Sequence, residues 1–166
     1  MGALGNVLAL ATLSIPTPVG QIAFDFSHIG TLVVALYSGA LLGGLTGALV
    51  GMAPYYRFGV VGGFGPILGL MIIPGKSLTG ITAGLLARRL RPGFATLVGY
   101  VPEAVFTFFY FEWIAPFFLA PKVGAYVMTL VVPVLAKAWL EMIVIAVVME
   151  AIKRRDIVHR LLATSE

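Results

Sequence analysis

The sequence contains no cysteine, so disulfide bonds, thiolate nucleophiles, iron–sulfur clusters and cysteine-ligated zinc are excluded. Motifs for enzymatic chemistry are missing as well. No serine lies in a G-x-S-x-G turn, no H-E-x-x-H helix occurs, and the glycine-rich stretch 59–63 lacks the Lys and Ser or Thr of a phosphate-binding loop. We therefore expect no enzymatic activity and no cofactor, and any use of ATP must come from a partner.

Charge is scarce too, because Asp, Glu, Lys and Arg make up 11% of the 166 residues and hydrophobic residues 60%. An average soluble domain carries roughly 25% charged residues on its surface. The composition thus excludes a soluble globular protein, and its hydrophobicity excludes a disordered chain. The net charge of +4 does not indicate nucleic-acid binding, since the basic residues lie where a membrane protein keeps its cytoplasmic charges.

Hydropathy, with Gly and Pro as interruptions, predicts an all-α integral membrane protein of the plasma membrane. We expect a six-helix transmembrane bundle as a single domain, residues 1–152, followed by a basic amphipathic cytoplasmic tail, residues 153–166. The predicted segments are about 3–15, 29–53, 59–73, 77–90, 94–119 and 123–152. The alternative is that 59–90 forms one long or re-entrant element.

Charge distribution favours six crossings. They put Arg57, the cluster Arg88, Arg89 and Arg91, and the basic tail on one face, with Lys76 and Lys122 on the other. The positive-inside rule then predicts that both termini are cytoplasmic. The loop from Pro16 to His28 becomes external, where it serves as a lid or as a simple connector. Asp25 and His28 in this loop are candidate ligand contacts, but His159 is expected on the opposite face, so no metal site is predicted.

Small residues recur every four positions in the second segment, at Gly39, Gly43, Gly47 and Gly51. Glycine destabilises a helix, so this register predicts that another helix approaches its backbone very closely. Gly5 and Ala9 repeat the spacing in the first segment. The spacing does not decide whether the partner helix belongs to this chain or to another subunit.

Ionisable residues inside membrane segments are costly unless they are paired or face a wet cavity. Glu103, Lys137 and Glu141 are predicted at a similar depth, whereas Glu112 points to the face opposite Glu103. Tyr126 shares a helical stripe with Lys137 and Glu141, and Tyr110 belongs to an aromatic run that could stack on a planar ring. These residues form either a ligand site or a buried pair that fixes helix packing.

The order of features resembles a known family. The sequence Phe24-Asp25-Phe26-Ser27-His28 leads into the glycine-rich segment 38–51, and Pro74-Gly75-Lys76, the segment 81–87 and a last helix with Pro133 and Lys137 follow. This pattern is similar to the substrate-binding S components of energy-coupling factor (ECF) transporters, small six-helix proteins that capture vitamins or similar micronutrients.

The resemblance implies a pocket on the extracellular side, closed by the first loop, and coupling to a transmembrane T component and two ATPase subunits. Docking in that family uses two small residues four apart on the first helix, for which Gly5 and Ala9 are the nearest match here. The histidine close behind the initiator Met of the nickel and cobalt members is absent, so a metal substrate is not implied. Two alternatives remain open: a small channel or proton-linked carrier, and a non-transporting assembly subunit.

Overall fold

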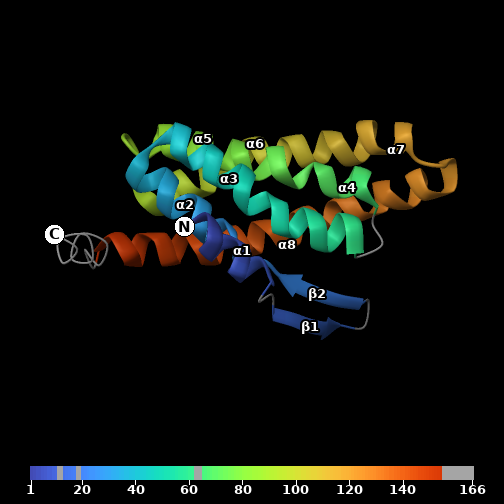
Figure 1. Ribbon diagram of the computed structural model, residues 1–166, viewed down its shortest axis with the longest axis horizontal. Coiled ribbons are helices and arrows are strands. Elements are labelled where there is room, and N and C mark those ends of the chain that lie inside the picture. The colour runs from blue at the N-terminus through green and yellow to red at the C-terminus, as the bar shows by residue number, and fades with distance from the viewer. Residues whose placement is uncertain (11–12, 18–19, 62–64, 155–166) are drawn as a thin grey trace.

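A computed structural model describes residues 1–10, 13–17, 20–61 and 65–154, and this part of the chain consists of six helical runs and one β-hairpin. The long runs lie side by side along one axis (Figure 1). The runs are α1 (Gly2–Leu10); α2 (His28–Ser38); α3 (Ala40–Pro54) with the π-helical η1 (Tyr55–Val61); α4 (Pro66–Leu70) with α5 (Ile72–Leu86); α6 (Pro92–Phe109) with the π-helical η2 (Tyr110–Ile114) and α7 (Ala115–Phe118); and α8 (Pro121–Arg154).

The β-hairpin joins α1 to α2. Its strands are β1 (Leu13–Thr17) and β2 (Gly20–Phe24), which pair antiparallel with Leu13 opposite Phe24 and Thr17 opposite Gly20. The first predicted helix, residues 3–15, is therefore wrong at its end, because the helix stops at Leu10. The sequence LSIPT carries β-branched residues and a proline, which suit a strand at the edge of a sheet better than a helix.

The second predicted helix, 29–53, is also wrong as a single element. Gly39 adopts φ 89°, a conformation that residues with a side chain rarely adopt, and the chain reverses there between α2 and α3. A Cβ placed on Gly43 would lie 2.7 Å from the Cβ of Ala35, so α2 folds back onto α3. Gly39 thus lies in a turn between two helices. It does not belong to the row of glycines at spacings of four from Gly43 to Gly51, which we call the glycine ladder.

The glycines of this ladder pack α3 against α5 so closely that the two backbones are in contact. A Cβ on Gly43 would lie 2.6 Å from the carbonyl oxygen of Gly80, and one on Gly51 would lie 2.8 Å from the Cα of Ile73. A Cβ on Gly47 would overlap the carbonyl group of Lys76. The contacts run antiparallel and continue to Gly59 beside Gly69. The helix that approaches the ladder therefore belongs to the same chain.

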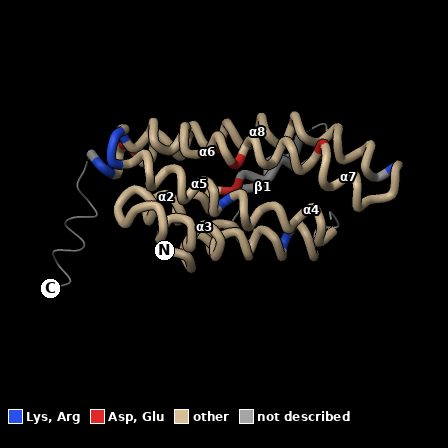
Figure 2. The backbone as a smooth tube through the Cα atoms, turned by 90° about the horizontal axis from the view of Figure 1, so that it is seen from above, with Lys and Arg blue, Asp and Glu red and all other residues tan. Residues whose placement is uncertain are grey.

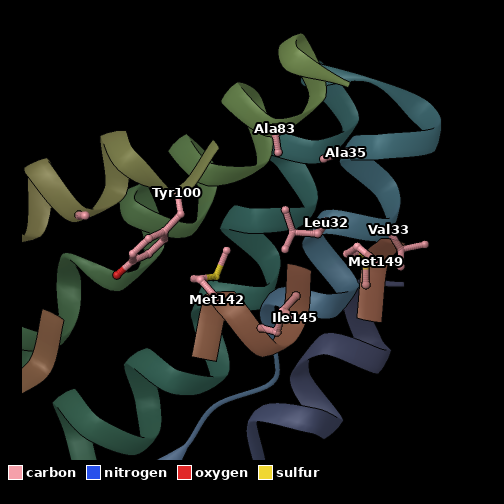
Figure 3. Close-up of a cluster of buried hydrophobic side chains, with 9 residues drawn as sticks. Leu32, Val33, Ala35, Ala83, Tyr100, Met142, Ile145 and Met149 are labelled. Atoms are coloured by element: carbon pink, nitrogen blue, oxygen red, sulfur yellow. The ribbon is translucent and has the colours of Figure 1, made fainter. Parts of the chain in front are cut away.

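Two apolar clusters lie at different levels of the bundle. One gathers side chains of α2, α5, α6 and α8, among them Leu32, Tyr100, Met142 and Ile145 (Figure 3). The other joins α4, η2, α7 and α8 through Leu68, Phe111, Ala115, Val127 and Val131. Along α8 the residues between Val131 and Met142 separate the two clusters, and the charged residues Lys137 and Glu141 lie there.

Three helical stretches of the described chain are long and apolar enough to cross a membrane: Pro66–Leu86, Pro92–Phe118 and Gly124–Lys153. Large apolar side chains cover their outer faces, including Phe117 at 84% exposure and Val147 at 67%. Exposing such an apolar surface to water is unfavourable, whereas exposing it to lipid is not. The chain is thus a helical membrane protein. Helices α1 and α2 have 9 and 11 residues, fewer than the roughly 20 that a full crossing needs.

Basic residues gather at one end of the bundle, where α5 connects to α6 and α8 ends (Figure 2). This end carries Arg88, Arg89, Arg91 and Lys153. Arg57 does not share it, because α3–η1 runs antiparallel to α4–α5 and brings Arg57 to the end where η1 meets α4. The predicted grouping of Arg57 with the Arg88 cluster is therefore wrong. The predicted segment 59–73 is also wrong as one helix, because η1 ends at Val61 and α4 begins at Pro66. The tail beyond Arg154 lies outside the described residues.

Candidate functional site

Lys76 forms a buried ion pair with Asp25, although the sequence predicted that Lys76 lies in an external loop. It lies inside α5 and is 2% exposed. Its Nζ lies 3.1 Å from Oδ2 of Asp25 and donates to Oγ of Ser27 at 2.6 Å. The backbone amide of Ser27 donates to Oδ1 of Asp25 at 2.8 Å. The segment that follows β2 is thus held against the first half of α5.

Burial alone would raise the pKa of the Asp25 carboxyl. The neighbouring Lys76 ammonium, the His28 ring and the hydrogen bonds from Ser27 outweigh that effect and hold the pKa well below its usual range. Asp25 is therefore a carboxylate at neutral pH, and its charge complements that of Lys76.

Glu103 of α6 forms the second part of the cluster. Thr79 of α5 donates its hydroxyl hydrogen to Oε2, and Nε2 of His28 lies 3.5 Å from Oε1. A Cβ on Gly75 would lie 3.2 Å from Cγ of Glu103, so the missing side chain at Gly75 makes room for this carboxylate. Nδ1 of His28 is buried and has no hydrogen-bond partner in the described structure.

Glu141 of α8 completes the cluster. Its Oε1 lies 3.2 Å from Nζ of Lys137, one turn earlier on the same helix, and accepts a hydrogen bond of 2.7 Å from the backbone amide of Asp25. Glu141 is 5% exposed, whereas the Lys137 side chain is 29% exposed. One carboxylate thus connects α8 to the segment after β2, while its lysine partner remains partly open.

A cavity of about 120 Å³ lies among these side chains. The charged or ionisable residues that line it are Asp25, His28, Lys76, Tyr100, Glu103, Lys137 and Glu141, and apolar residues such as Phe58, Met71 and Met142 complete the wall. Pockets for drug-sized ligands measure roughly 300 to 1,000 Å³. As it stands, the cavity therefore fits a molecule smaller than such ligands. A larger ligand requires the wall of the cavity to move.

The charges around the cavity do not balance when only its carboxylates and ammonium groups are counted. Three carboxylates, of Asp25, Glu103 and Glu141, face two ammonium groups, of Lys76 and Lys137. A buried excess charge is costly. A proton held within the cluster, or a positively charged group on a bound molecule, would neutralise it.

The structure brings together five of the seven residues that the sequence nominated for ligand binding: Asp25, His28, Glu103, Lys137 and Glu141. The other two lie elsewhere. Tyr126 is 62% exposed, because the buried stripe of α8 passes through Val127 and Val131 instead. Tyr110 donates its hydroxyl hydrogen to the carbonyl oxygen of Ile67 within the second apolar cluster.

Sequence reasoning missed Lys76, Thr79 and Tyr100. Pro74-Gly75 suggested a break before Lys76, yet α5 continues through both residues. A usable signal was present, since Lys76 precedes Gly80 and Gly84 at spacings of four and so shares their buried face.

The candidate docking residues of the first helix are used inside the chain. A Cβ on Gly5 would lie 2.5 Å from the Val50 side chain and 3.1 Å from the carbonyl oxygen of Ser27. Ala9 is 3% exposed, and Arg57 donates to its carbonyl oxygen at 3.0 Å. Both small residues therefore pack against the described part of their own chain.

Comparison with known proteins adds no assignment: no family model, no curated protein and no solved structure matches the chain. Among the described residues, no group of three or more His, Asp or Glu side chains is placed to hold a metal ion. The cavity and the charges around it are therefore the features that bear on function.

Proposed function

We propose that this chain is the substrate-capturing membrane subunit of an importer, an S component of the ECF type, and that it binds a small, vitamin-like micronutrient in the central cavity. The observation that carries the proposal is the convergence of charged side chains from α5, α6, α8 and the segment before α2 on one cavity between two apolar clusters. Membrane proteins tolerate such groups in their interior chiefly where they serve binding or transport.

The chemistry of the cavity favours a ligand with a positively charged nitrogen. Such a group offsets the excess carboxylate charge near Glu103 and Glu141, and Lys137 is partly open to receive an anionic or polar end. The apolar wall from Phe58 and Met71 suits a hydrocarbon or ring portion between the two ends. A small zwitterion meets all three conditions.

The direction of the helical runs supports a six-helix topology with both termini toward the cytoplasm. Runs α3–η1, α4–α5, α6–α7 and α8 alternate in direction. Met1 contacts Gly30, whereas Ala9 contacts Arg57, so α1 runs toward the end that carries Arg57 and α2 runs away from it. The positive-inside rule assigns the basic end to the cytoplasm. A T component and two ATPase subunits are the partners we propose for energy coupling.

The decisive experiment is mass spectrometry of the small molecule retained after purification in mild detergent. We expect Lys137→Ala and Glu103→Gln to lose the retained molecule while the protein remains folded, and Glu112→Gln, outside the cavity lining, to keep it. Wild-type retention by both cavity variants, together with a loss of stability, would instead assign these charges to helix packing.

Uptake assays distinguish the remaining function classes. An S component takes up substrate only with its ATPase partners. Uptake by the purified chain alone in proteoliposomes would support a channel or proton-linked carrier, which could use the same buried charges as a pathway. Absence of any bound small molecule would support an assembly subunit.

A further inference from the structure

A groove runs between α6 and α8 at the basic end of the bundle and has no role in the proposed capture of substrate. Its volume is about 490 Å³. Small residues form part of its lining and larger apolar residues the rest: Gly93, Phe94, Leu97, Ile143, Ala146 and Val147. Phe94 and Val147 are 64% and 67% exposed. Because α6 and α8 are membrane-spanning helices, this groove opens toward hydrocarbon.

A second hollow, of about 460 Å³, adjoins the groove at the helix ends. The two hollows share Arg91 and Glu150 as lining residues. Around the second hollow lie four exposed basic residues, Arg88, Arg89, Arg91 and Lys153. An apolar groove thus continues into a basic hollow at the level where a helix leaves the membrane.

Glu150 is the one acidic residue that lines either hollow. Its Oε2 accepts a hydrogen bond of 3.2 Å from the backbone amide of Gly93, in the first turn of α6. This carboxylate is therefore directed at the start of α6, where the helix dipole also favours negative charge. The basic residues outnumber it and leave the hollow strongly positive.

We propose that the groove and the basic hollow together bind one anionic phospholipid. Its phosphate lies among Arg88, Arg89 and Arg91, and an acyl chain occupies the groove between α6 and α8. Charge complementarity selects the headgroup, because arginine forms paired hydrogen bonds with phosphate oxygens. Continuity of the apolar groove with the basic hollow selects an amphiphile over a free anion.

The test uses the purified full chain, delipidated and titrated with phosphatidylglycerol or phosphatidylcholine, with bound lipid counted by native mass spectrometry. We expect phosphatidylglycerol to bind preferentially. The exposed double variant Arg88→Gln/Arg91→Gln should weaken that binding by about tenfold or more, since each basic residue near a membrane surface contributes appreciably to anionic lipid binding. Lys122→Gln, at the opposite end, is the matched control and should bind as the wild type does.

A second pair of variants tests the acyl chain. Ala151→Trp places a bulky ring at an exposed residue of the groove, and Val132→Trp places the same ring on a lipid-facing site of α8 outside it. We expect the first substitution to displace the lipid and the second to leave it bound. Equal binding of the two lipids, or binding of glycerol phosphate alone as tight as that of phosphatidylglycerol, would overturn the proposal.

Discussion

At the scale of single residues, the central feature is a lysine almost fully withdrawn from solvent. Lys76 makes its contacts with Asp25 and Ser27 across a sequence separation of about fifty residues. Removing one member of a buried ion pair leaves the other as an uncompensated charge, which costs more than the pair itself contributes. Lys76 and Asp25 should therefore behave as one energetic unit.

The corresponding prediction is a double-mutant cycle. We expect Lys76→Met to lower the free energy of unfolding by roughly 3 to 5 kcal/mol, because it strands the Asp25 carboxylate. Asp25→Asn in the same background should recover part of that loss, whereas Lys122→Met should change stability by no more than about 0.5 kcal/mol. Thermal and denaturant unfolding in detergent provide the measurement. Strict additivity of the two central substitutions would contradict the coupling.

At the scale of elements, helix pairing depends on glycines whose missing side chains let two backbones touch. Lipid is as apolar as leucine, so helices in a membrane gain little from hydrophobic burial and rely on close packing instead. The antiparallel contact of α3 with α5 through Gly43, Gly47 and Gly80 is the closest of this kind in the described bundle. It also fixes the height of Lys76, which lies opposite Gly47.

We therefore predict that even a methyl group at Gly47 is harmful. Gly47→Ala should destabilise the protein by about 1 to 3 kcal/mol through overpacking, despite the better helix propensity of alanine. Gly2→Ala is the control, because its Cβ would lie 3.7 Å from the nearest atom, an ordinary contact. Unfolding of the two variants in one detergent allows a direct comparison. Equal stability would show that α3 and α5 can separate without cost.

At the scale of the whole molecule, charge is arranged in three levels along the bundle axis. Arginines and a lysine lie at one end, ion pairs lie in the middle, and Arg57 and Lys122 lie toward the other end (Figure 2). From the excess of basic residues at one end, the positive-inside rule predicts that this end faces the cytoplasm. The same rule predicts that the end with the connection between α7 and α8 is external.

Cysteine labelling tests this orientation without background, since the chain has no cysteine of its own. With an impermeant reagent on intact cells, we expect Lys122→Cys and Val61→Cys to react and Arg91→Cys to react only after permeabilisation. Val61 is the discriminating position, because it ends η1 at the Arg57 end and is 66% exposed. Reaction at Arg91 but not at Lys122 would reverse the orientation.

The sequence by itself determined that the protein is helical and lies in a membrane. A surface that faces lipid requires apolar residues, so the composition and the long hydrophobic runs indicate that environment directly. It also determined that the ladder residues Gly43, Gly47 and Gly51 require a closely packed neighbour, since only backbone contact offsets the cost of glycine in a helix. Glu103, Lys137 and Glu141 could be nominated for the same reason: a charge in an apolar segment needs a partner.

Tertiary structure alone decided which partners these residues have. Gly39 is a turn because its positive φ reverses the chain, and that reversal places His28 and Asp25 inside the bundle instead of at its surface. Lys76 lines the cavity because α5 continues through Pro74-Gly75, whereas the local propensities of proline and glycine predict a helix break there. Local patterns specify what a residue needs, but the distance between segments far apart in the chain follows from the packing of all the helices together.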